Sequence, residues 1–173
     1  VNSQTGDLIA SYGVELDIDF DGRGDYLITA LDPGRHAEWS VEDVQVWQDQ
    51  NKDVGGGQPG SADDTPGDGY ETLLFDAGLG LNPDLAWVRV LPVTPETVEF
   101  AFLPLLLGEK GEFGWWVWSS RSIFDVLSFE LPDVLEDEGI NGLDNTCAYA
   151  FGGSLNKLPN RCQIFVPTST PID

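Results

Sequence analysis

The sequence predicts an all-β protein: an antiparallel β-sandwich of jelly-roll-like form, with long loops rich in Gly and Asp. Short segments rich in β-branched and aromatic residues recur along the chain, and turn-forming Gly, Pro, Asn and Asp separate them. No amphipathic helical pattern of useful length interrupts the series. A chain built from many short strands closes most economically as a sandwich, and a barrel is the alternative.

The first two candidate strands flank an acidic loop. Residues 12–19, "YGVELDID", alternate apolar and acidic side chains with period two, as a strand with two different faces does. Residues 25–31, "DYLITAL", form the second strand, and Gly22 and Gly24 lie between the two. We therefore expect a β-hairpin with the acids at its turn.

The remaining strands follow in order, each recognised by its β-branched and aromatic content and by the turns around it. They cover residues 38–48, 70–76, 85–91, 97–103, 113–119 and 163–166. A long interruption rich in Gly, Pro and Asp separates the third strand from the fourth, at residues 49–69. A structureless loop of that length is uncommon unless it is functional or held by a ligand.

The length indicates one domain, which we place at residues 1–166, with residues 167–173 as the start of a Pro/Thr linker. The formal net charge of −22 argues against nucleic acid and anionic membranes as partners, and favours cations or neutral molecules such as glycans. Salt adaptation is a competing explanation of this acidity. No apolar run reaches membrane-spanning length, so we expect no membrane insertion.

Cys147 and Cys162 enclose a stretch containing Gly152, Gly153 and Pro159, which lets the chain fold back. A disulfide there would stabilise the domain by roughly 3 kcal/mol in the chain-entropy account. Two free thiols are the alternative. The acidity, the linker and the absence of Met favour a mature segment of an extracellular or cell-surface protein, where disulfides persist.

The acidic loop is the first candidate site. Its spacing D-x-D-x-D-G-x-x-D places carboxylates at alternate positions before a glycine, which suits a calcium ion that needs six to eight oxygen ligands. Same-face acids of an extended strand lie nearly 7 Å apart. The metal interpretation therefore requires the strand to end near Asp19 and curl; a solvated strand face, which would also include Glu15, is the alternative. The expected ligands are Asp17, Asp19, Asp21 and Asp25.

This spacing resembles the calcium loop of integrin-type FG-GAP repeats, in which a hairpin loop binds calcium between two strands. A second run, Asp49, Asn51 and Asp53, repeats the alternate-oxygen pattern at the head of the long loop. We include it among the candidate metal ligands. A surface turn is the interpretation that we favour for this run.

The aromatic strand "FGWWVWSS" is the second candidate site. Trp116 and Trp118 would share one face, either as an exposed platform for sugar rings or as covered core. The same two interpretations, sugar platform or core, are open for Trp39, Trp47 and Trp87. No catalytic residue is predicted, because the single histidine, His36, has no partner that the sequence identifies.

Several segments together are similar to bacterial secreted modules of the DOMON and family 9 carbohydrate-binding type. They are "ELDIDFDGRGDYLI", "DLAWVRV", "TVEFAFLPLLLG" and "FGWWVWSS", within residues 12–119. The resemblance implies a sandwich that binds sugars or haem, often carries calcium and usually lacks catalytic activity. A Met/His haem ligation is not available to a chain with no Met.

The function expected from these observations is a non-catalytic extracellular calcium-binding β-sandwich module that acts in surface or glycan binding. A structural subunit of a cell-surface layer, sheath or filament, assembled from copies of itself with calcium, is the alternative. A small polysaccharide hydrolase is the second alternative.

Overall fold

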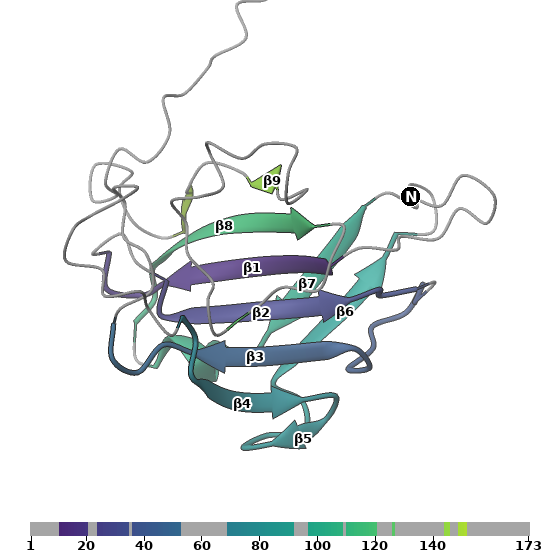
Figure 1. Ribbon diagram of the computed structural model, residues 1–173, viewed down its shortest axis with the longest axis horizontal. Helices are drawn as coiled ribbons and strands as arrows, with labels where there is room; N and C mark the ends of the chain where they lie inside the picture. The colour runs from purple at the N-terminus through teal and green to yellow at the C-terminus, as the bar shows by residue number, and fades with distance from the viewer. Residues whose placement is uncertain are drawn as a thin grey trace, which may run out of the picture.

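The chain forms antiparallel β-structure in two sheets (Figure 1). The computed structural model describes residues 11–20, 24–34, 36–52, 69–91, 97–108, 110–120, 126, 144–145 and 149–151. Along the larger sheet the strands lie in the order β10 (Tyr149–Phe151), β8 (Phe113–Ser120), β1 (Ser11–Asp17), β2 (Tyr26–Leu31), β3 (Val44–Gln48), β4 (Thr72–Asp76) and β5 (Leu79–Gly80). The short β9 (Asp144–Asn145) also pairs with β8, and the smaller sheet consists of β6 (Ala86–Val90) and β7 (Val98–Phe102).

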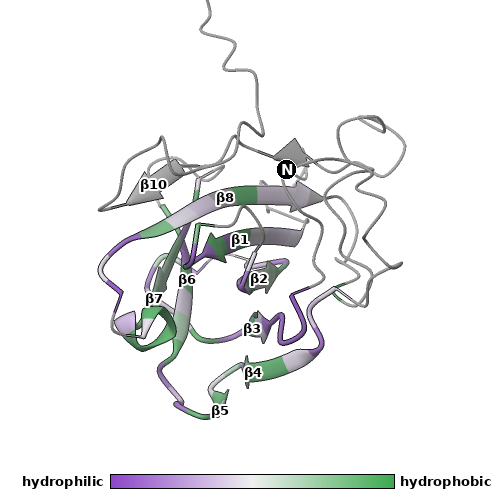
Figure 2. Cartoon of the chain, turned by 90° about the vertical axis from the view of Figure 1, so that its left-hand side faces the viewer, coloured by the Kyte–Doolittle hydropathy of each residue, from purple (hydrophilic) through white to green (hydrophobic). Residues whose placement is uncertain are grey.

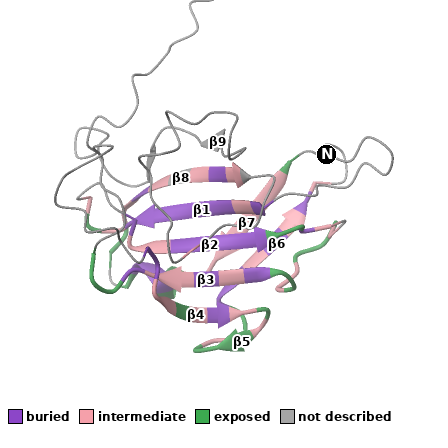
Figure 3. Ribbon diagram, in the orientation of Figure 1, coloured by how far each residue is buried: buried purple, intermediate pink, exposed green. Residues whose placement is uncertain are grey.

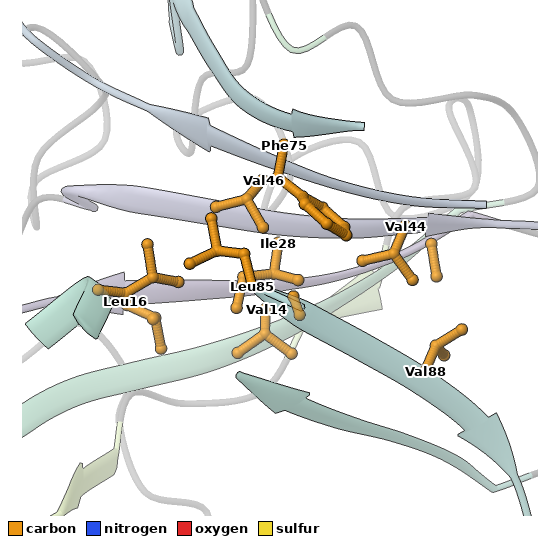
Figure 4. Packing of buried hydrophobic residues seen from close by; sticks show 11 residues of the cluster. Val14, Leu16, Ile28, Val44, Val46, Phe75, Leu85 and Val88 are labelled. Atoms are coloured by element: carbon orange, nitrogen blue, oxygen red, sulfur yellow. The ribbon is translucent and has the colours of Figure 1, made fainter. Parts of the chain in front are cut away.

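The smaller sheet lies across one face of the larger one (Figure 2). The buried apolar side chains of both sheets pack together as one core. Strands β1, β2 and β3 each contribute alternate residues to this core, β4 contributes Phe75, and β6 contributes from the opposite side (Figure 4). The 3-10 helix η1 (Pro104–Leu107) adds one apolar side chain. The buried residues of this core are Val14, Leu16, Ile28, Ala30, Val44, Val46, Phe75, Leu85, Ala86, Val88 and Leu106.

Strand β1 is buried on both of its faces (Figure 3). It lies between β2 and β8, with Leu16 opposite Tyr26 on one side and opposite Trp115 on the other. Val14 and Leu16 point into the core, while Glu15 and Asp17, on the opposite face, are both 0% exposed. The solvated-face interpretation is therefore wrong for Glu15 and Asp17, because the second face of this central strand is covered rather than open to water.

The predicted hairpin is confirmed, with β1 and β2 antiparallel from Ser11↔Leu31 to Leu16↔Tyr26. The predicted strand at 38–48 is shorter than expected: pairing with β2 covers only Val44–Gln48, and Ser40 instead bridges to Val88 of β6. The positive φ of Asp43 (64°) separates these two parts.

The predicted segments at 70–76, 85–91, 97–103 and 113–119 all contain strands. The segment 163–166 and the linker at 167–173 lie outside the described residues. Strands β5, β9 and β10, two or three residues long, are too short to give a periodic signal in the sequence. In the described part of the chain, no helix is both long and apolar enough to cross a membrane.

The β4–β5 hairpin depends on Gly80. Its φ is +134°, and a Cβ at this position would come within 2.1 Å of the Leu74 carbonyl oxygen. We expect Gly80→Ala to lower the free energy of unfolding by more than about 1 kcal/mol. Gly111 is the matched control, because a Cβ there meets no atom within 4 Å. Chemical denaturation of both variants checks this; equal midpoints would show that the hairpin tolerates the side chain.

Candidate metal centre

The hairpin loop between β1 and β2 curls sharply after Asp17. The Asp17 Oδ1 accepts a 2.6 Å hydrogen bond from the backbone N–H of Phe20, whose φ is 62°. On the other side of the loop, Asp25 Oδ2 accepts a 2.7 Å bond from the N–H of Ile18, and the N–H of Asp25 donates to the Leu16 carbonyl at 2.7 Å. The strand thus ends at Asp17 and bends, which is the geometry that the metal interpretation requires.

This curl brings three carboxylates together. One oxygen each from Asp17, Asp19 and Asp25 lies within 4.8 Å of the others. Two ligands of one calcium ion lie at most about 5 Å apart, since each is roughly 2.3–2.6 Å from the ion. Asp17 is buried, Asp25 is half-buried and Asp19 is exposed, so the group opens to solvent on one side. The fourth predicted ligand, Asp21, lies outside the described residues.

Two lysines offset the negative charge of this loop. The Lys52 ammonium forms an ion pair with Asp19 Oδ2, and the Lys110 ammonium donates to the Ile18 carbonyl at 2.8 Å. Lys52 is more than half exposed, so solvent screens its ion pair and the stability it adds is small. A cation that uses Asp19 as a ligand would therefore share or displace Lys52.

The second acidic run lies beside the first. Both β1 and β3 pair with β2 in antiparallel fashion, so they run in the same direction and end at the same edge of the sheet. Asp49 Oδ1 accepts a 2.6 Å bond from the N–H of Lys52, whose φ is 63°. The same turn joins Asp17 and Phe20, because in both cases the donor follows the aspartate by three residues. The N–H of Asp49 also donates to the Asp25 carbonyl at 3.1 Å.

The two acidic segments nevertheless differ, because only the first brings several carboxylates close together. Asp49 is 5% exposed, and among the described residues it does not belong to the converging carboxylate group. Asn51 is exposed, and Asp53 lies outside the described residues. Asp49 thus forms the hydrogen-bonded turn that the surface-turn interpretation expects, but Asp49 itself is buried rather than at the surface. This turn carries Lys52 to Asp19.

A buried polar network adjoins the loop, and the sequence did not reveal it. Glu15 Oε2 accepts a 2.6 Å bond from the Trp118 indole N–H, and Glu15 Oε1 accepts a bond from the Tyr70 hydroxyl. Glu15 and Tyr70 are 0% exposed. A Cβ on Gly24 would come within 2.0 Å of the Tyr70 hydroxyl oxygen and 2.5 Å of Glu15 Oε1, so the loop packs directly against this network.

The network corrects one prediction. Trp118 is 2% exposed and its N–H is bound to Glu15, so its interpretation as an exposed sugar platform is wrong and its interpretation as core is right. The side chain of Trp116 lies outside what the structure describes, as do Cys147 and Cys162 with their predicted disulfide.

The loop also affects the pKa of Tyr26, the first residue of β2. Burial, and after it the neighbouring Asp25 carboxylate, raises the pKa of the Tyr26 hydroxyl above its ordinary value. A carboxylate next to a half-buried phenol disfavours the phenolate, since both would carry negative charge. Tyr26 therefore stays neutral well above neutral pH.

Comparisons with the models of known protein families, with curated proteins and with solved structures give no match to this chain. The resemblances described for the acidic loop and the strand segments stay predictions.

The Glu15 network gives a direct test of what anchors the loop. Tyr70→Phe removes only the hydroxyl that donates to Glu15, leaving a buried carboxylate with one donor fewer. We expect the free energy of unfolding to fall by about 1–3 kcal/mol. Tyr26→Phe is the control, because it removes a hydroxyl from a half-buried tyrosine of β2 and leaves the Tyr70–Glu15 hydrogen bond in place. If Tyr70→Phe were as stable as the parent, the network would not contribute to stability.

Proposed function

We propose that this chain is a non-catalytic calcium-binding module and that Asp17, Asp19 and Asp25 provide the side-chain ligands. The observation that carries the proposal is the curl after Asp17, which brings three carboxylates within one ion's reach. Carboxylate oxygens without imidazole or thiolate ligands favour a hard cation such as calcium over zinc.

The remaining ligands of a calcium ion would be oxygens of the loop backbone and water, since six to eight are needed. Calcium accepts irregular sets of this kind, whereas magnesium demands near-octahedral geometry. Because Asp17 is buried at the base of the loop and Asp19 is exposed at its mouth, the ion would bind from solvent without opening the core. The surrounding charge of −22 raises the local concentration of cations.

The packing of β6 and β7 against the larger sheet supports a β-sandwich as the architecture of this module. The acidity that favours a cation-rich setting supports an extracellular or cell-surface location. In such a setting a calcium-bound loop would stabilise the folded domain, because the ion binds the folded form and not the unfolded chain.

A second candidate function is calcium-assisted assembly of copies of this chain. Leu79 and Leu81 are 74% and 80% exposed, and they lie at the β5 end of the larger sheet. An exposed apolar sheet edge favours pairing with another chain. Size-exclusion chromatography with and without calcium separates the candidates: a monomer under both conditions leaves the binding module as the function, and calcium-dependent oligomers favour assembly.

Removal of one ligand tests the metal site. We expect a chelator to lower the melting temperature of the parent, and Asp19→Asn to abolish that difference because the variant no longer holds the ion. Asp84→Asn is the control: it removes the same charge from an exposed turn outside the loop. Differential scanning calorimetry in calcium and in chelator gives the answer. A parent whose melt is identical in both would rule calcium out.

Lys52 offers a second test of the same site. Lys52→Gln removes the ammonium that pairs with Asp19, so we expect calcium affinity to rise by roughly two- to fivefold. Lys110→Gln removes the same charge but contacts a carbonyl, so a smaller change is expected. Isothermal titration at fixed ionic strength measures both. An affinity that falls in Lys52→Gln, or rises equally in both variants, would contradict competition for Asp19.

A further inference from the structure

The outward face of the smaller sheet carries aromatic and polar side chains that are partly exposed. Along β6, Ala86, Val88 and Val90 point into the core, whereas Trp87 and Arg89 alternate with them and are half-buried. The face that Trp87 and Arg89 share is therefore the one that points away from the larger sheet. This face belongs to a different sheet from β8, the strand on which the sequence predicted an aromatic platform.

Three side chains from neighbouring segments form a row on this face. The bridge between Ser40 and Val88 places Trp39 next to Arg89, and the pairing of β6 with β7 places Glu99 on the other side of Arg89. The Arg89 guanidinium carbon lies 4.5 Å from the centroid of the Trp39 ring, and Arg89 Nε forms an ion pair with Glu99.

The row is held in place yet open to solvent. Trp39 is 42% exposed although the guanidinium stacks on its ring, and the Arg89 and Glu99 side chains are 32% and 34% exposed. The stacking and the ion pair reduce the freedom of all three side chains before any ligand arrives, which lowers the entropic cost of binding. Trp87 lies two residues from Arg89 on the same strand, about 7 Å away, so it extends the aromatic surface along β6.

We propose that the surface formed by Trp39, Trp87, Arg89 and Glu99 binds an uncharged carbohydrate. A pyranose ring presents one face of C–H groups, which packs on an indole, and a rim of hydroxyls, which both donate and accept hydrogen bonds. The indoles provide the apolar contact. Arg89 provides donors and Glu99 provides acceptors beside them, within the same row.

The charge of the row selects the class of sugar. Arg89 and Glu99 neutralise each other, so the row has no net charge to attract an ionic ligand. The chain as a whole carries −22 and repels anionic polysaccharides. The row spans two strands and one flanking segment, roughly 10 Å at ordinary strand spacing, which suits a short oligosaccharide better than a protein interface of about 800 Å².

Binding to neutral polysaccharides tests the proposal. The probes are insoluble cellulose, chitin and β-1,3-glucan in pull-down assays, with cellohexaose, mannohexaose, laminarihexaose and chitohexaose in isothermal titration. We expect the parent to bind at least one of these, and Trp39→Ala and Trp87→Ala to weaken that binding by roughly tenfold or more. Leu105→Ala is the control, because Leu105 is 63% exposed in η1 and lies outside the row.

Glu99→Gln provides a second variant that keeps both indoles and removes only the carboxylate; weaker binding is expected here as well. No binding to any neutral probe, preference for an anionic polysaccharide such as alginate, or unchanged affinity in Trp39→Ala would overturn the proposal.

The experiment also separates this surface from the calcium loop. The row lies on β6, β7 and the segment paired with β6, whereas Asp17, Asp19 and Asp25 lie in the β1–β2 hairpin of the other sheet, so we expect sugar binding to persist in chelator and in Asp19→Asn. Sugar binding that persists without any calcium binding would leave the surface intact and remove only the metal site. Sugar binding that depends on calcium and on Asp19 would place the ligand at the loop and overturn the proposal.

Discussion

The central constraint on this fold is the burial of carboxylates on β1. The strand lies in the middle of the larger sheet, so both of its faces are covered, yet one of them carries Glu15 and Asp17. A buried carboxylate is costly unless hydrogen bonds satisfy it. Glu15 is satisfied by Tyr70 and Trp118, which come from distant parts of the chain, and Asp17 by the turn that follows it. Satisfying these two groups fixes where the neighbouring segments lie.

The candidate metal centre follows from the same constraint. Asp17 receives its hydrogen bond from the N–H of Phe20 only if the chain turns at once, and this turn swings Asp19 back toward Asp25. Gly24 packs against the Glu15–Tyr70 pair, where a larger residue would not fit. The packing of the loop against the buried network therefore determines its conformation. The three carboxylates converge in this conformation without a bound ion.

The sequence predicted most strands and three members of the carboxylate group, because period-two alternation and the D-x-D-x-D-G spacing are local signals. It could not predict that Glu15 is buried, since an acid at an alternating position looks the same whether the face is wet or covered. Nor could the sequence show which tryptophans are buried and which are exposed. Trp118 and Trp39 are equivalent in the sequence, and only the pairing of strands shows that one is bound to Glu15 and the other stacks on Arg89 at the surface.

The most direct test of the proposed calcium site is a crystal structure of the chain grown with calcium, with an anomalous difference map. If these carboxylates bind calcium, we expect a single strong peak about 2.3–2.6 Å from oxygens of Asp17, Asp19 and Asp25, with the Lys52 ammonium displaced from Asp19. A map with no peak there, and with Lys52 still paired to Asp19, would contradict it. The acidic loop would then be a hydrogen-bonded turn neutralised by lysine.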